Sequence, residues 1–239
     1  METPPGPQAG RTPARPRTLS VAERFCGPPG VVNGGYVSGL AAGYLPGAGS
    51  VEVTLRAPTP VEADVLVERT PAGVSFVRGG RLLVEAVAAA EDPEPAPFVP
   101  PEEAAAAGAA FPGLVDHPFP GCYVCGFREG MRIHPGPTGV PGVFAALWRV
   151  PEGTAEPLPA CEVWGALDCV SAWVHLRPGD VALLGRLTGR VHRSAFPGRA
   201  YVVTARYEGV ERRKLFATSA VHEPDGTLVA AGRATWIAL

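Results

Sequence analysis

Apolar and polar positions along the chain repeat the same order of elements twice. In the first half, an apolar stretch of helical length precedes four strand-like runs, and together they occupy residues 36–45, 51–57, 62–70, 73–77 and 81–90. In the second half, the corresponding helix and runs occupy residues 161–176, 181–193, 199–209, 213–223 and 227–239. Both helices are apolar nearly all round, which is typical of a helix enclosed by other structure. The pattern therefore predicts two units, each with a helix covered by an antiparallel sheet.

Turn residues and local composition divide the chain further. Gly79-Gly80 and Asp225-Gly226 precede the last strand of each half, and both pairs suit a two-residue turn. Residues 91–120 are rich in Pro, Ala and acidic residues, which indicates a linker with a short helix near 101–110. We therefore expect a disordered tail, an N-terminal unit, the linker and a C-terminal unit, at residues 1–17, 18–90, 91–120 and 121–239.

Composition narrows the class of protein. The chain is 46% hydrophobic and carries a net charge of -2, which gives no electrostatic reason to expect a nucleic acid or a membrane surface as partner. No apolar run approaches the roughly 20 residues of a membrane helix, and the Pro-rich start lacks the apolar core of a signal peptide. Five cysteines at uneven spacing argue against a secreted disulfide framework. We therefore expect a cytoplasmic globular protein.

Two short motifs carry a resemblance to a known family. Asn33-Gly34-Gly35 opens the first helix, and the second helix contains the stretch WGALDCVSAW at residues 164–173. With the repeated order of elements, they make the chain resemble the tandem hotdog acyl-CoA thioesterases, and the local motifs are similar to the phenylacetyl-CoA thioesterase branch. The resemblance implies an α+β fold of two hotdog units in tandem, each a long central helix wrapped by an antiparallel sheet. It also implies hydrolysis of an acyl-CoA or acyl-carrier thioester without a cofactor, and association into a homodimer.

The resemblance further implies a site shared between the two halves. In this family the backbone N–H groups of an Asn-Gly-Gly or His-Gly-Gly stretch polarise the thioester carbonyl, and an acidic residue comes from a helix of the other protomer. In this chain the first half keeps Asn33, Gly34 and Gly35 but has alanine where the acid would stand. The second half has the acid, Asp168, but proline and alanine where the Asn-Gly-Gly stretch would stand. Each half has lost what the other keeps, as expected if one composite site survived in a fused pair.

The chemistry of these residues supports the placement, although each has a structural alternative. N–H groups at a helix start, aided by the helix dipole, stabilise the negative charge of a thioester oxygen under attack. Alternatively, Asn33 is only an N-cap and the glycines only a tight turn. Asp168 stands alone in an apolar stretch, where a carboxylate is costly unless it is paired, hydrogen-bonded or used in chemistry. We expect a general base or nucleophile there rather than a structural aspartate.

Hydroxyl residues are further candidates for substrate binding. Another tandem hotdog family, the acyl-CoA thioesterase II type, combines an aspartate, a hydroxyl residue and a glutamine. The only glutamine of this chain is Gln8, in the expected tail, so that triad is absent. Ser171, one turn beyond Asp168, and Thr218 or Ser219, on a predicted strand, remain as hydroxyl groups for the site. Ordinary packing positions are the alternative for all three.

A short basic run offers a site for the phosphates of coenzyme A. The run ERRKLF at residues 211–216 includes Arg213 and Lys214, and clustered basic side chains hold phosphate groups. The alternative is a solvated hairpin.

The run GCYVCG at residues 121–126 raises the question of a metal. Cys122 and Cys125 form a Cys-x-x-Cys pair, which is half of a zinc site, and His117 and His134 are near enough in sequence to complete one. No second Cys-x-x-Cys or His-x-x-x-His follows. We therefore predict a turn that leads into the C-terminal unit, and no bound metal.

Two function classes remain as alternatives to hydrolysis. A non-catalytic binder of acyl-CoA or acyl carrier would show saturable binding without thiol release. A hotdog dehydratase needs a base beside the carbonyl, and those families resemble one another in placing histidine at the helix start. Here that position is Asn33, so we rank dehydration behind binding.

Overall fold

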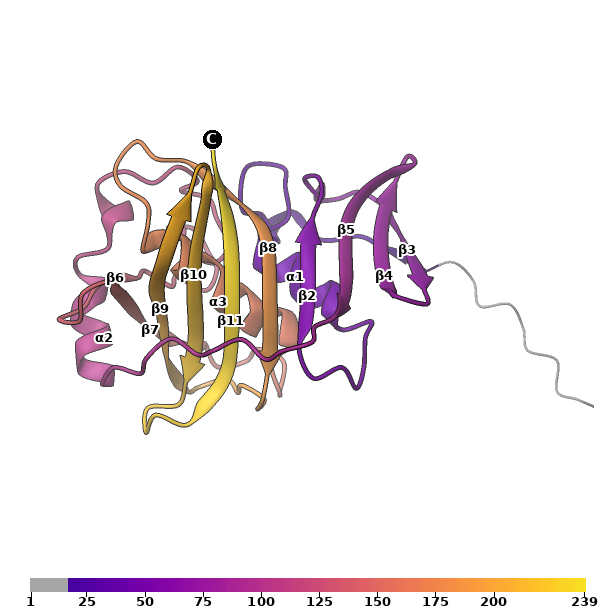
Figure 1. The fold of residues 1–239 in the computed structure, drawn as a ribbon. Helices are drawn as coiled ribbons and strands as arrows, with labels where there is room; N and C mark the ends of the chain where they lie inside the picture. The colour runs from indigo at the N-terminus through magenta and orange to yellow at the C-terminus, as the bar shows by residue number, and fades with distance from the viewer. Residues whose placement is uncertain (1–16) are drawn as a thin grey trace, which may run out of the picture.

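The computed structural model describes residues 17–239 and arranges them around one antiparallel sheet (Figure 1). Its helices in that range are α1 (Gly34–Ala42), α2 (Pro101–Gly108) and α3 (Ala160–Trp173), with short 3-10 turns at Glu23–Phe25 and Pro112–Leu114. Its strands are β1 (Arg17–Leu19), β2 (Val51–Leu55), β3 (Val65–Thr70), β4 (Gly73–Arg78), β5 (Arg81–Ala88), β6 (Gly136–Pro137), β7 (Val143–Arg149), β8 (Ala182–Val191), β9 (Ala200–Glu211), β10 (Lys214–His222) and β11 (Leu228–Ala238). No helix within residues 17–239 is long and apolar enough to cross a membrane.

The sheet joins the two halves of the chain edge to edge. Its strand order is β1-β3-β4-β5-β2-β8-β11-β10-β9-β7-β6, so the strands of the first half lie on one side and those of the second half on the other. The halves meet where β2 pairs antiparallel with β8, and Val53 stands opposite Leu187 at this junction. Both side chains are fully buried, so the core continues across the junction.

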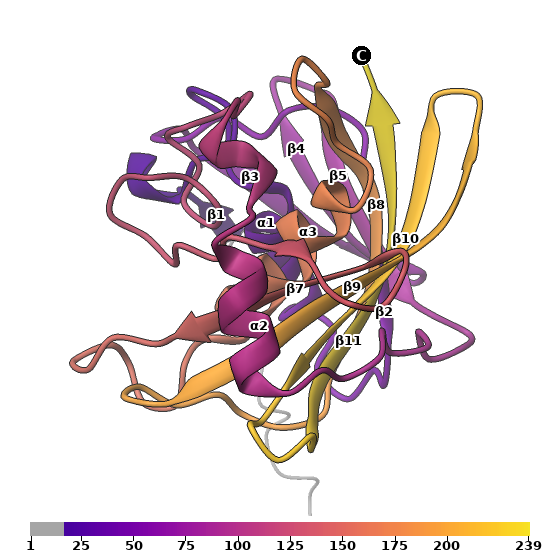
Figure 2. The same ribbon diagram turned by 90° about the vertical axis from the view of Figure 1, so that its left-hand side faces the viewer.

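Helices α1 and α3 lie side by side against one face of the sheet (Figures 1 and 2). Glycines of α1 allow the close approach. A Cβ at Gly35 would lie 2.4 Å from the Cβ of Asp168, and one at Gly39 would lie 2.5 Å from the Cα of Cys161. Only glycine fits at these two positions without moving a helix.

Helix α1 is shorter than the long central helix expected for each unit. It has nine residues and begins at Gly34, two residues before the predicted start. The chain leaves the helix at Gly43, and the N–H groups of Tyr44 and Leu45 turn back to the carbonyls of Ala41 and Ala42. The second helix, α3, has 14 residues and is close to its predicted extent.

The hairpin turns agree only in part with the prediction. Gly79 and Gly80 have φ of 56° and 75° and form the predicted two-residue turn between β4 and β5. A second two-residue turn lies at Arg212-Arg213, between β9 and β10, where Arg212 has φ of 55°. The basic run 211–216 therefore includes a hairpin turn, and its role in phosphate binding stays a prediction.

The predicted two-residue turn at Asp225-Gly226 is wrong. Strand β10 ends at His222 and β11 begins at Leu228, which leaves a five-residue loop, 223–227. The Asp225 carboxylate accepts a hydrogen bond from the N–H of Thr227 at 2.9 Å, so the aspartate closes the loop from within.

The segment between β5 and α2 crosses the opposite face of the sheet, where it passes over β8, β11, β10 and β9 (Figure 1). Arg206 of β9 pairs with Glu94 of this segment, and Arg190 of β8 pairs with Asp92. The short helix predicted near 101–110 is α2, which packs against β6 and β7. The unit boundaries remain a prediction, and the predicted tail lies outside the described residues apart from Arg17, the first residue of β1.

Candidate active site

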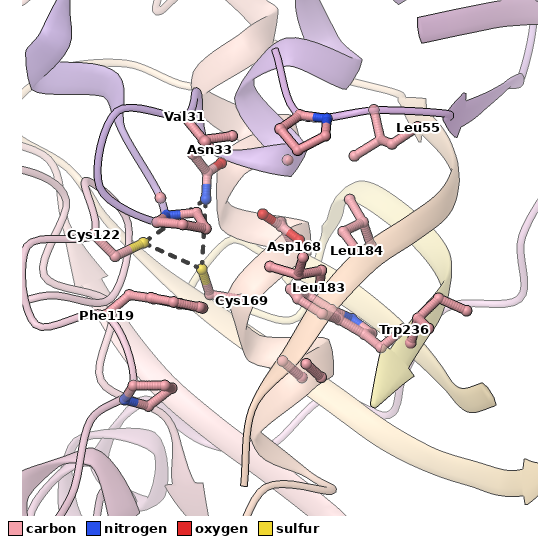
Figure 3. A pocket seen from close by; sticks show the side chains of 18 of the residues that line it. Val31, Asn33, Leu55, Phe119, Cys122, Asp168, Cys169, Leu183, Leu184 and Trp236 are labelled. Atoms are coloured by element: carbon pink, nitrogen blue, oxygen red, sulfur yellow. Dashed lines mark hydrogen bonds between the residues drawn. The ribbon is translucent and has the colours of Figure 1, made fainter. Parts of the chain in front are cut away.

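A cavity of about 490 Å³ lies where the start of α1, the middle of α3 and the start of β8 meet (Figure 3). Most of its lining is apolar and includes Val31, Leu55, Phe119, Leu183, Leu184 and Trp236. The polar residues at its wall include Asn33, Asp168 and three cysteines, together with Arg56, Thr59 and His117. Elements from both halves of the chain therefore build this cavity.

Asp168 is the carboxylate of the cavity. Its side chain is 1% exposed. The Oδ2 atom accepts a hydrogen bond of 2.8 Å from the backbone N–H of Gly35, which joins the second half to the start of α1. The Oδ1 atom has no hydrogen-bond partner, and no arginine, lysine or histidine forms an ion pair with Asp168 among residues 17–239. One carboxylate oxygen is thus buried without a hydrogen-bond partner among the described residues.

The surroundings of Asp168 also change its protonation. Burial raises the pKa of Asp168 to about 7, against the hydrogen bond from Gly35, which lowers it. The nearby thiol of Cys122 raises this pKa further, and the side chain of Asn33 lowers it. An aspartate in this range accepts a proton more readily than an ordinary surface aspartate does.

Asn33 is the N-cap of α1. Its Oδ1 atom accepts a hydrogen bond of 2.9 Å from the N–H of Tyr36. Its Nδ2 atom points toward sulfur, 3.8 Å from Sγ of Cys122 and 3.7 Å from Sγ of Cys169 (Figure 3). Asn33 therefore caps α1, both ends of its amide have partners inside the protein, and its role in catalysis stays a prediction.

Gly34 keeps a backbone donor free for a ligand. Its N–H makes no hydrogen bond within residues 17–239, whereas the N–H of Gly35 is used by Asp168. Gly34 lines the cavity, and a Cβ at this position would lie 2.9 Å from the side chain of Leu184. Of the N–H groups expected to meet the carbonyl, Gly34 is the one that the structure leaves unpaired.

The predicted hydroxyl residues lie away from the cavity. Ser171 is fully buried; its Oγ donates to the carbonyl of Asp168 and accepts a 2.9 Å hydrogen bond from the indole of Trp236. Thr218 points to the opposite face of β10, where its hydroxyl contacts Glu208 at 3.3 Å. Its neighbour Ser219 faces α3, as alternation along a strand requires. Ser171 thus supports a cavity residue, and the placement of Thr218 removes it from the site.

The predicted phosphate-binding residues lie in the β9–β10 hairpin, at one end of these two interior strands of the sheet. Arg213 is in the β9–β10 turn, and its carbonyl accepts a hydrogen bond from Ala238 of β11 at 2.8 Å. Lys214 pairs with Ile237, which lines the cavity. Sequence reasoning missed Arg56, which also lines the cavity and pairs with Glu85 at 2.6 Å. An isolated arginine after a strand carries no sequence signal for a ligand.

Three cysteines converge on the cavity wall. Cys122 and Cys125 come from the 121–126 turn and Cys169 comes from α3, and their sulfur atoms all lie within 4.8 Å of one another. Hydrogen bonding with Cys125 and then Cys169 lowers the pKa of the Cys122 thiol well below its usual range, against burial, which raises it. The sequence offered no local signal for Cys169, since it lies 44 positions beyond Cys125.

Comparisons of this chain with known proteins by sequence and by structure gave different results. No protein-family model matches it, and no curated protein matches it by sequence. Solved structures do match. The tesB protein of Mycobacterium avium subs paratuberculosis has a TM-score of 0.63 and 14% identity, covering 93% of this chain and 92% of that one. The acyl-CoA thioesterase II TesB2 of Mycobacterium marinum has a TM-score of 0.61 and 16% identity, with the same coverage.

A third match is described by its fold. It is a conserved protein of unknown function with a hot dog fold from Alicyclobacillus acidocaldarius, with a TM-score of 0.57 and 14% identity over 96% of this chain and 95% of that one. The chain has a hotdog fold. The hotdog assignment rests on architecture over nearly the whole chain, and the predicted phenylacetyl-CoA thioesterase branch stays a prediction.

Proposed function

We propose that the chain consists of two hotdog units in tandem and hydrolyses an acyl-CoA or acyl-carrier thioester at one site formed by both. The observation that carries the proposal is the hydrogen bond from Gly35 to Oδ2 of Asp168, a cavity residue whose Oδ1 atom is buried without a hydrogen-bond partner among the described residues. This contact joins the helix start of the first half to the acid of the second. The fold of TesB2, described as an acyl-CoA thioesterase II, supports the same reaction class.

The chemistry assigns a different task to each half. The N–H of Gly34 and the dipole of α1 stabilise the thioester oxygen as it becomes negative. Asp168 removes a proton from a water molecule, and the hydroxide adds to the carbonyl carbon. The C–S bond then breaks, the thiolate takes the proton back, and a free acid and a thiol leave. Asn33 acts as a positioning residue, because its cap fixes the first turn of α1.

The cavity fits an acyl group better than a polar ligand. Its volume of about 490 Å³ lies within the range of small-molecule sites, roughly 300–1,000 Å³, and its wall is mainly apolar. We assign Arg213 and Lys214, with Arg56, to the phosphates of coenzyme A, because Lys214 pairs with Ile237 at the cavity wall and Arg56 lines the cavity. No cofactor is required for this reaction.

Dehydration has less support from the site. The histidine that lines the cavity in the described part of the chain is His117. Its Nε2 atom lies 3.1 Å from the carbonyl of Cys125, and its Nδ1 atom accepts a hydrogen bond of 3.0 Å from the N–H of Phe119. Both ring nitrogens are therefore engaged, and the imidazole is not free to remove a proton beside a carbonyl.

A thiol-release screen tests the proposed function. Wild-type protein is mixed with short, long and aromatic acyl-CoAs, and free coenzyme A is measured with a thiol reagent, with calorimetry run on the same panel. We expect release that saturates with at least one acyl-CoA. Saturable binding across the panel without release would contradict hydrolysis and favour a binding protein, and water loss from a 3-hydroxyacyl-CoA would favour a dehydratase.

A further inference from the structure

The cysteine cluster has the geometry of a metal site. Sγ of Cys122 lies 3.8 Å from Sγ of Cys169, and Sγ of Cys125 lies within 4.8 Å of both. Sulfur ligands at about 2.3 Å from a tetrahedral Zn²⁺ lie about 3.8 Å apart. All five cysteines of the chain are free thiols, and these three are buried. The three sulfur atoms thus stand at distances that one ion can bridge with small movements.

The 121–126 turn is folded in the way that presents two thiols to one ion. The N–H of Gly126 donates to the carbonyl of Cys122 at 2.8 Å. A Cβ at Gly126 would lie 2.5 Å from that carbonyl oxygen, so glycine is required for the turn. The turn therefore carries both thiols on one short, closed segment of chain, and the thiolate is the form of each that binds a metal.

The side chain of Asn33 supplies an N–H donor to the cluster. Nδ2 of Asn33 lies 3.8 Å from Sγ of Cys122 and 3.7 Å from Sγ of Cys169. Cys122 and Cys169 therefore share an N–H donor in addition to the neighbouring thiols. Buried thiols with such a donor match the outer shell of a thiolate metal site.

We propose that Cys122, Cys125 and Cys169 bind one Zn²⁺ ion through their thiolates. Binding releases to solvent the protons that the three thiols still carry, and no oxidation or reduction takes place. Zinc is favoured because it prefers thiolate ligands in a tetrahedral arrangement. This proposal goes beyond thioester hydrolysis and does not depend on it, and it reverses the sequence-based prediction that the Cys-x-x-Cys pair binds no metal.

The ion would have one coordination position that these cysteines do not fill. All three cysteines line the cavity, and Cys169 directly follows Asp168 on α3. Three protein ligands with one position for water or substrate are the pattern of zinc sites that take part in chemistry. The ion would also link the 121–126 turn to α3, and it would therefore stabilise the part of the cavity wall that faces the start of α1.

Metal analysis of matched variants tests the proposal. The full chain is purified under reducing conditions, supplied with ZnCl₂, desalted and measured for zinc by mass spectrometry. We expect about one zinc per chain for wild type and for Cys161→Ser, a buried cysteine of α3 outside the cluster. Cys122→Ser and Cys169→Ser should each lose at least about tenfold in zinc affinity. Equal zinc retention in all four proteins would overturn the assignment of these ligands.

A second measurement on the wild type does not depend on whether the variants fold. Co²⁺ replaces zinc, and thiolate coordination gives sulfur-to-cobalt charge-transfer bands near the ultraviolet together with visible bands of tetrahedral cobalt. We expect both sets of bands to saturate at one Co²⁺ per chain and to disappear on addition of Zn²⁺. Wild-type protein that binds neither ion, either with three free thiols or with a disulfide between Cys122 and Cys169, would overturn the proposal.

Discussion

The two carboxylate oxygens of Asp168 have different surroundings, and the proposed chemistry depends on that difference. Oδ2 is held by the N–H of Gly35, and Oδ1 has no partner among the described residues. Burying a carboxylate with one oxygen unpaired costs stability. Such a loss of stability is typical of sites where a buried polar group interacts with a ligand rather than with other residues of the protein. At Asp168, the arrangement that serves the proposed activity therefore lowers the stability of the fold.

Asn33 offers a prediction about capping. Asn33→Ala removes the acceptor for the N–H of Tyr36 and should lower stability by about 1 kcal/mol. Turnover should fall roughly 10- to 100-fold, because the free N–H of Gly34 loses its fixed position. Asn33→Ser restores the cap without the amide and should regain most of both losses. Stability and turnover are measured by thermal unfolding and thiol release.

The outcome for Asn33→Ser separates two roles. If the serine variant regains stability but not turnover, the amide of Asn33 itself contacts the substrate, and its role as a positioning residue is contradicted.

At the residue scale, the sequence predicted the pairing of Asp168 with the Asn-Gly-Gly stretch because each half lacked what the other kept. It could not predict that Gly35 would donate to Asp168, since that depends on how closely the two helices approach. Thr218 was predicted to contact the substrate, but its side chain lies on the other face of β10. The sequence alone does not determine which face of the sheet a strand residue occupies. Cys169 was missed because only the fold brings it to Cys122.

The contact between α1 and α3 gives a prediction at the element scale. A Cβ at Gly39 would lie 2.5 Å from Cα of Cys161 and 2.8 Å from Cβ of Trp164. Gly39→Ala should therefore force the helices apart and cost roughly 1–3 kcal/mol. Gly43→Ala is the matched control, because Gly43 has helical φ of -61° and its nearest contact would be 3.4 Å away. Chemical denaturation of both variants checks this, and equal stability would contradict the close helix packing.

The β9–β10 hairpin gives a prediction about coenzyme A. Replacing Arg213 and Lys214 together by glutamine should raise KM for acyl-CoA about threefold to tenfold with kcat unchanged, as expected for exposed charges that contact phosphate. A short acyl-pantetheine substrate, which lacks those phosphates, should show no change. Arg81→Gln, in the exposed β4–β5 hairpin, is the control. An equal KM rise for both substrates would assign the hairpin to shape rather than to phosphate binding.

Elements with strong local signals were predicted well. Gly79-Gly80 gave the β4–β5 turn because both residues adopt positive φ. Strand β7 was missed because VFAALWR is nearly all apolar, without the alternation that marks a half-buried strand. The Asp225-Gly226 turn failed because the aspartate closes a longer loop. Propensity located the turn there but did not determine its length.

At the scale of the whole molecule, one continuous sheet places the two helices side by side and brings a single acid to a single helix start. The halves of a symmetric pair would make two such sites, and this chain keeps the residues for one. The junction of β2 with β8 is therefore as important for the proposed activity as the site residues. The homodimer and the cytoplasmic location expected from the sequence stay predictions, and the proposed site within one chain does not require a second copy.

Kinetics of Asp168→Asn test the central claim most directly. Asparagine keeps the volume and an acceptor for the N–H of Gly35, and it removes the charge and the basic oxygen. We predict that turnover under saturating acyl-CoA falls roughly 100- to 10,000-fold, with the Kd for acyl-CoA changed less than about twofold. The thermal midpoint should not fall, because an incompletely paired buried charge is removed. A folded Asp168→Asn variant with near wild-type turnover would contradict the account.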